Sequence, residues 1–113
     1  MADRLLPGDA LEFIRTCVRQ RRVHWTYHVN MWLAGRHISR DQVFGAIDSY
    51  EVIESYPDDK YLPSYLVLGT TADITFHVLF AVEVETDSVR VITAYRPNPI
   101  DWDPDLRSRS SKA

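Results

Sequence analysis

The chain has 113 residues, enough for one hydrophobic core and too few for two domains of ordinary size, so we expect a single domain over residues 1–113. Its hydrophobic content of 45% is typical of a globular protein and argues against disorder, except at residues 1–7 and 107–113, which we expect to be flexible. A net charge of −3 argues against non-specific nucleic-acid binding, which needs a concentrated basic surface. Basic residues nevertheless gather in the first forty positions, so the net charge does not exclude a local basic face.

The sequence predicts a cytoplasmic protein that does not enter a membrane. The longest apolar run, Val78 to Val82, is far too short to cross a bilayer. The N-terminal residues contain Asp3 and an early Pro7 instead of the apolar segment of a signal peptide. The single cysteine, Cys17, can form no internal disulfide, as expected in a reducing compartment.

Three helices are predicted in the N-terminal half of the chain. The first lies near residues 9–21 and begins at Asp9, whose carboxylate can cap it. After a break at residues 23–26, a short helix is predicted over 27–34, closed by a glycine. A third helix near 39–48 begins at a capping serine.

Arginines recur at helical spacing in the first of these helices. Arg15, Arg19 and Arg22 are expected to share one face. Such a stripe fits a solvated helix face or a phosphate-binding surface, and the residues alone favour the solvated face.

Four strands are predicted in the second half, at residues 51–56, 64–69, 74–84 and 89–96. Alternation in the third strand places its aromatic and valine residues on a core face and His77 on the opposite, half-exposed face. The strands follow one another through short turns, which is typical of an antiparallel meander. The predicted fold class is therefore α+β, with N-terminal helices packed on one face of a four-stranded, mainly antiparallel sheet.

Neither a metal nor a cofactor is expected. His24 and His28 are four residues apart, but no cysteine cluster or adjacent carboxylate completes a tetrahedral zinc site. The chain also has no glycine-rich phosphate loop, no G-x-S-x-G and no C-x-x-C motif.

What remains is a scattered set of residues that bear acid–base or anion-binding groups: His28, Arg36, His77, Tyr95 and Arg96. Metal-free RNA cleavage needs a base for the 2′-hydroxyl, an acid for the leaving oxygen and a cation for the phosphorane, and this set contains all three. The alternative is that the histidines hydrogen-bond within the fold and that Tyr95 is an ordinary strand aromatic. The residues alone favour this structural alternative.

Several stretches resemble a prokaryotic family of domains of unknown function, number 4258: Trp25–Met31, Leu33–Ser39, Tyr61–Tyr65, Phe76–Val78 and Ile92–Pro97. The resemblance covers about residues 23–103, and members of that family are more distantly similar to the RelE and BrnT toxins of type II toxin–antitoxin operons. It implies a RelE/BrnT-like fold and mRNA cleavage.

Matched residue by residue, the resemblance implies a catalytic set of His28, Arg36, His77 and Tyr95. It implies substrate contacts from Arg96 and from Trp32, which stands where many relatives carry a basic residue. The leading hypothesis is thus a toxin-type, metal-independent endoribonuclease, or a descendant without activity, with RNA as substrate and a cognate antitoxin as partner. The alternative is a non-catalytic protein-interaction module of the same fold, and a homodimer is compatible with both.

Overall fold

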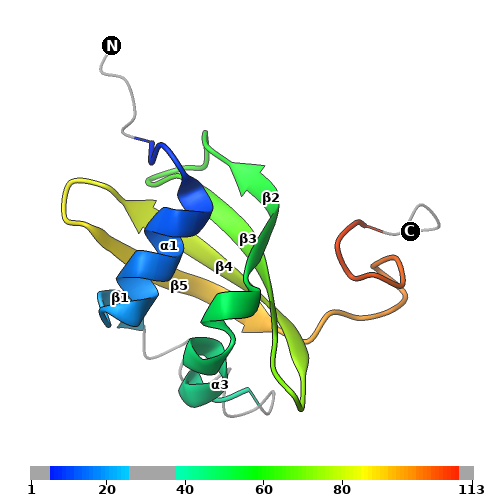
Figure 1. The fold of residues 1–113 in the computed structure, drawn as a ribbon. Helices are drawn as coiled ribbons and strands as arrows, with labels where there is room; N and C mark the ends of the chain where they lie inside the picture. The colour runs from blue at the N-terminus through cyan, green and yellow to red at the C-terminus, as the bar shows by residue number, and fades with distance from the viewer. Residues whose placement is uncertain (1–5, 26–37, 110–113) are drawn as a thin grey trace.

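The computed structural model describes residues 6–25 and 38–109 and shows a sheet with helices on one face (Figure 1). No helix within these two ranges is long and apolar enough to span a membrane. The helix predicted over residues 27–34 lies outside the described residues. The elements in chain order are α1 (Ala10–Arg19), β1 (Val23–Trp25), α3 (Arg40–Gly45), the 3-10 helix η1 (Ile47–Ser49), β2 (Glu51–Tyr56), β3 (Ser64–Thr70), β4 (Thr75–Glu83) and β5 (Ser88–Tyr95).

The sheet has five strands in the order β1-β5-β4-β3-β2. Strands β2 to β5 form the antiparallel meander that the alternation predicted. The prediction of four strands was wrong, because β1 adds a fifth and pairs in parallel with β5, Val23 opposite Val89. Three residues are too few for a period-two pattern to show, so this segment was interpreted as a break between helices. The fold is α+β with a mixed sheet.

The predicted start of α1 is confirmed. The Asp9 carboxylate accepts a hydrogen bond from the Glu12 backbone N–H at 3.1 Å, which satisfies one of the free donors at the helix end. Ile14, Cys17 and Val18 are buried on the side of α1 that faces the sheet. Cys17 is therefore a core thiol, and burial raises its pKa.

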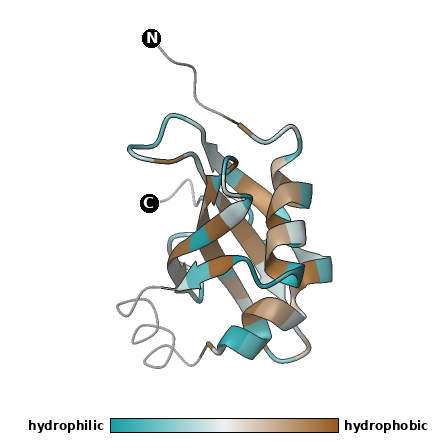
Figure 2. Cartoon of the chain, turned by 90° about the vertical axis from the view of Figure 1, so that its left-hand side faces the viewer, coloured by the Kyte–Doolittle hydropathy of each residue, from teal (hydrophilic) through white to brown (hydrophobic). Residues whose placement is uncertain are grey.

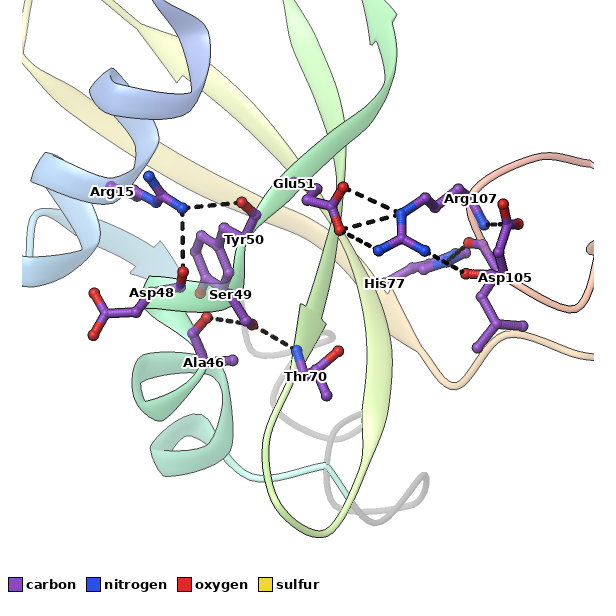
Figure 3. A network of polar contacts seen from close by, with 11 residues as sticks. Arg15, Ala46, Asp48, Ser49, Tyr50, Glu51, Thr70, His77, Asp105 and Arg107 are labelled. Atoms are coloured by element: carbon purple, nitrogen blue, oxygen red, sulfur yellow. Dashed lines mark hydrogen bonds and ion pairs between the residues drawn. The ribbon is translucent and has the colours of Figure 1, made fainter.

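The arginines of α1 bind to the fold itself. Arg15 donates to backbone carbonyls at the junction of η1 and β2, at 3.2 to 3.3 Å (Figure 3). Arg19 pairs with the Asp48 carboxylate at 3.1 Å. Arg22 was expected on the same helix face, but α1 ends at Arg19, and Arg22 follows the helix and pairs with the Asp87 carboxylate at 3.1 Å. Arg15 and Arg19 therefore fasten α1 to η1 and its junction with β2, and Arg22 fastens the turn after α1 to the β4–β5 loop.

A capping box starts α3. The Ser39 hydroxyl accepts from the Gln42 N–H at 3.0 Å, while the Gln42 side chain accepts from the Ser39 N–H at 2.8 Å. The predicted helix over 39–48 ends as an α-helix at Gly45 and continues as the 3-10 turn η1. The serine cap was predicted correctly, and the final turn is tighter than expected.

The core lies between the helices and the sheet face that they cover, where apolar residues of both layers meet (Figure 2). Phe76, Val78, Phe80 and Val82 alternate along β4 and are fully buried, as predicted. Gly69 on β3 makes room for this packing, because a Cβ added there would lie 2.9 Å from Cζ of Phe76. The opposite face of the sheet carries His77, Leu79 and Ala81 of β4.

Candidate functional site

Polar side chains gather on the sheet face opposite the helices, which we call the open face. Strand register places Glu51, Leu68, His77 and Tyr95 in one row across it. A β-bulge just before Glu54 brings this residue onto the same face as Glu51, although the two are three positions apart. Three adjacent rows of residues therefore carry carboxylates, an imidazole and phenols on one surface.

His77 and Tyr95 are in direct contact. They are cross-strand partners, and the His77 Nδ1 lies 3.2 Å from the Tyr95 hydroxyl oxygen. The His77 Nε2 lies 2.8 Å from the Leu106 carbonyl, which can only accept. Nε2 therefore carries the proton, and in the neutral ring Nδ1 accepts from the Tyr95 hydroxyl.

His77 is 0% exposed, so the expectation of a half-exposed ring was wrong. Desolvation by burial lowers the pKa of His77 and outweighs the hydrogen bond to Leu106 and the charge of Glu54, which raise it. Burial also raises the pKa of the Tyr95 hydroxyl above its ordinary value of 10.0. Both groups are therefore neutral near pH 7. A neutral imidazole can accept a proton, and a neutral phenol can donate one.

Residues 97–109, which we call the C-terminal segment, bury His77. Trp102 is 4% exposed, and its ring packs edge-on against the imidazole with centroids 4.4 Å apart. Leu106, whose φ of 62° is uncommon for a leucine, presents the carbonyl that binds Nε2. Trp102 thus docks the C-terminal segment onto the domain.

Two arginines fasten the C-terminal segment to β2. Arg107 binds the Glu51 carboxylate with a shortest distance of 2.6 Å (Figure 3). Arg109 forms a bidentate pair with Glu54 at 2.9 and 3.1 Å and stacks over the Trp102 ring at 4.7 Å. Residues 107–109 were expected to be flexible, and these contacts hold them on the sheet.

Glu54 lies at the centre of a polar network. Burial raises its pKa, but hydrogen bonds from Arg109 and from the Tyr56 hydroxyl outweigh that effect, so the net pKa is below the ordinary 4.5. The hydrogen bond to Glu54 in turn raises the pKa of Arg109. We call Glu54, Tyr56, His77, Tyr95 and Arg109 the open-face cluster. Across the two described ranges, no group of three or more histidine, cysteine or acidic residues is placed to hold a metal ion.

A family model described as "Domain of unknown function (DUF4258)" matches residues 25–96, more than half of the chain. The chain belongs to the DUF4258 family. In this DUF4258 domain the match includes His77 and Tyr95 and ends immediately before the C-terminal segment. No curated protein and no solved structure matches the chain.

Of the residues predicted for the site of the DUF4258 domain, the structure brings His77 and Tyr95 together. Arg96 is exposed at the end of β5, and none of the described residues forms a hydrogen bond or ion pair with its side chain. The other three, His28, Trp32 and Arg36, lie outside the described residues, so their convergence stays a prediction.

Three members of the open-face cluster were not predicted as site residues: Glu54, its strand neighbour Tyr56, and Arg109. Glu54 was assigned to a weakly alternating strand, and the bulge that turns it onto the open face has no period-two signature. Arg109 was placed in a polar tail, and its carboxylate partner lies 55 positions earlier in the chain. The one feature of the sequence that indicates a packed C-terminal segment is Trp102, because a tryptophan is a large apolar side chain that tends to be buried.

Proposed function

We propose that this DUF4258 domain is a toxin-type, metal-independent endoribonuclease, resembling RelE and BrnT toxins, that cuts RNA with the His77 and Tyr95 side chains of its open-face cluster. One observation carries the proposal: Glu54, His77 and Tyr95, from three different strands, share one face. They are close enough for the Glu54 charge to act on the pKa of both other groups. Carboxylate, imidazole and phenol are the side chains that general acid–base catalysis uses most readily.

The proposed reaction is intramolecular transfer of the RNA phosphate. Nδ1 of neutral His77 takes the proton of the 2′-hydroxyl, and the O2′–P bond forms as the P–O5′ bond breaks. The Tyr95 hydroxyl gives its proton to the departing 5′-oxygen, so the products are a 2′,3′-cyclic phosphate and a 5′-hydroxyl. The His77–Tyr95 hydrogen bond then returns the proton from imidazolium to phenolate. Arg96 and, by the resemblance, His28, Trp32 and Arg36 complete the substrate contacts.

RNA reaches His77 in this proposal only after the C-terminal segment has left the open face. The ring is fully buried, because Trp102 and Leu106 cover it on the open face. The segment lies beyond the matched family region, which is consistent with a cover added to a common site. We place this activity in the cytoplasm, with a cognate antitoxin as the partner.

The decisive experiment compares RNA cleavage by the wild type with cleavage by a variant whose segment is loosened. Trp102→Ala removes the ring that covers His77, and replacing a buried tryptophan by alanine costs about 3–5 kcal/mol. We expect a gain in cleavage of a single-stranded oligoribonucleotide of about a hundredfold in the presence of EDTA. Ile100→Ala is the matched control, because Ile100 lies in the same segment and is 75% exposed.

His77→Gln in the Trp102→Ala background tests the base. A positioned acid or base contributes about 10²- to 10⁴-fold, so cleavage should fall by at least about a hundredfold while circular dichroism still shows a folded domain. If folded wild type and Trp102→Ala both leave RNA intact, the nuclease proposal is wrong.

The alternative, a non-catalytic interaction module, is favoured by one observation. Both ring nitrogens of His77 are hydrogen-bonded within the fold, as in a structural histidine. In that case the outer edge of β2, which terminates the sheet, would pair with a strand of a partner protein or of a second copy. Intact RNA together with a partner that protects the β2 amides from hydrogen exchange would support this module.

A further inference from the structure

The open face also holds a pocket of about 370 Å³ at the end of the sheet away from His77. Register places Ser64, Ala81, Arg90 and His24 in one row there, and Ala81 lies four residues along β4 from His77 on the same face. Four residues of a strand span about 13 Å. The side chains that line the pocket and enter the argument are Asp59, Lys60, Tyr61, Ser64, Ala81, Arg90 and Ile92.

Tyr61 is the unusual residue of this pocket. Its side chain is 87% exposed, and its backbone has a φ of 78°, in the left-handed region that bulky residues rarely adopt. An exposed ring contributes little to the core, and the backbone conformation is unfavourable. Stability therefore does not explain a tyrosine at this position, whereas strained backbone is typical of binding sites.

The charges around Tyr61 favour an anion. The Lys60 ammonium lies 5.3 Å from the centre of the Tyr61 ring, and Arg90 is exposed on the pocket wall. Among the described residues, none forms a hydrogen bond or ion pair with the Arg90 side chain. Asp59 also lines the pocket, and its two carboxylate oxygens accept hydrogen bonds from the Lys60 backbone N–H and the Ser64 hydroxyl. Two cations and one engaged acid thus border the ring.

We propose that this pocket binds single-stranded RNA, with one base stacked on Tyr61 and the adjoining phosphates held by Lys60 and Arg90. Exposed aromatic rings beside cations are the usual platform for single-stranded nucleic acids, because every base has a face to stack. The apolar floor that Ala81 and Ile92 provide suits a base edge. The proposal rests on the proposed function, since it supplies that site's substrate with a second contact about 13 Å along β4.

Binding is measured on the full chain by fluorescence anisotropy with a fluorescein-labelled 2′-O-methyl decauridine. This probe cannot be cut through its 2′-oxygen, so affinity is separated from cleavage. Tyr61→Ala should weaken binding by at least about fivefold, the lower end for loss of one stacked base. Arg90→Gln should weaken binding and reduce the slope of log Kd against log salt by about 0.7, the value for one phosphate contact on a single strand.

Two control variants separate stacking from general effects. Tyr61→Phe keeps the ring and should bind as the wild type does, and Ile100→Ala, an exposed apolar residue outside the pocket, should do the same. Tyr61→Gly should bind as weakly as Tyr61→Ala, with an unchanged or higher melting temperature because glycine tolerates the positive φ. A variant that is more stable and binds less would show that the ring serves the ligand.

The outcomes distinguish this inference from the proposed function. If Tyr61→Ala binds the probe as the wild type does, or if the wild type does not bind it, the pocket is no RNA platform, and a peptide ligand becomes the better hypothesis. If binding depends on Tyr61 but no segment variant cuts unmodified RNA, the platform stands and the nuclease proposal fails. If RNA is cut at the same rate without Tyr61, the nuclease stands and the platform fails.

Discussion

Acidification from pH 7.5 to 5.5 is expected to destabilise the domain through His77. The folded ring is fully buried, and desolvation holds its pKa below the ordinary 6.5. In the unfolded chain the same ring takes up a proton as the pH falls through about 6.5. The unfolded state then binds more protons than the folded state, so the free energy of unfolding decreases as the pH falls.

The size of the effect follows from one proton. A difference of one pH unit corresponds to about 1.4 kcal/mol, so the loss at pH 5.5 approaches about 1.4 kcal/mol when the folded pKa lies well below 5.5. The carboxylates that hold the C-terminal segment should add little in this interval. Hydrogen bonds from Arg107 and Arg109 lower the pKa values of Glu51 and Glu54 below the ordinary 4.5, so both stay ionised.

Urea unfolding at pH 7.5, 6.5 and 5.5 measures this loss in the wild type, His77→Gln and His24→Gln. His24 is the matched control because it is an exposed histidine on β1. We expect His24→Gln to follow the wild type and His77→Gln to lose less stability on acidification. An equal pH dependence in His77→Gln and the wild type would show that His77 does not titrate as argued.

Three further substitutions test the fold around the site, each by urea or thermal unfolding. Gly69→Ala should destabilise the domain by about 1–3 kcal/mol, because the new Cβ would lie 2.9 Å from Cζ of Phe76, and an unchanged stability would contradict this packing. Tyr50→Phe should cost about 1–2 kcal/mol, because it leaves the buried Val43 carbonyl without the hydroxyl that donates to it at 2.6 Å. Ser39→Ala should cost about 1 kcal/mol through loss of the cap, whereas Ser39→Asp should retain most of the stability.

Local pattern was enough to predict the layers of this fold but not the edge of its sheet. Apolar alternation located the meander, and capping residues located α1 and α3. Strand β1 was not predicted, because a strand of three residues has no recognisable pattern of its own. It forms by pairing with β5, which lies far along the chain. Tertiary context of this kind overrides local propensity.

The candidate site was predictable only as far as its strands. His77 and Tyr95 were assigned to paired strands from their spacing, and they do touch. The burial of His77 was not predictable, because it depends on Trp102 and Leu106 in a segment without regular structure. To predict that Glu54 lies on the open face, one would have to know of the β-bulge before it, and this bulge has no recognisable residue pattern.

The parallel pairing of β1 with β5 has a consequence for how the domain assembles during synthesis. Val23 pairs with Val89, so β1 leaves the ribosome 66 residues before its partner does. At about 5–20 residues per second, β1 waits roughly 3–13 s for β5, while the β2–β3 and β3–β4 hairpins can already form. Nascent α1 therefore has no finished sheet to cover during that interval. The strand that completes the sheet also leads directly into the C-terminal segment, so the residues that close over His77 follow within roughly 1–3 s of the completed sheet.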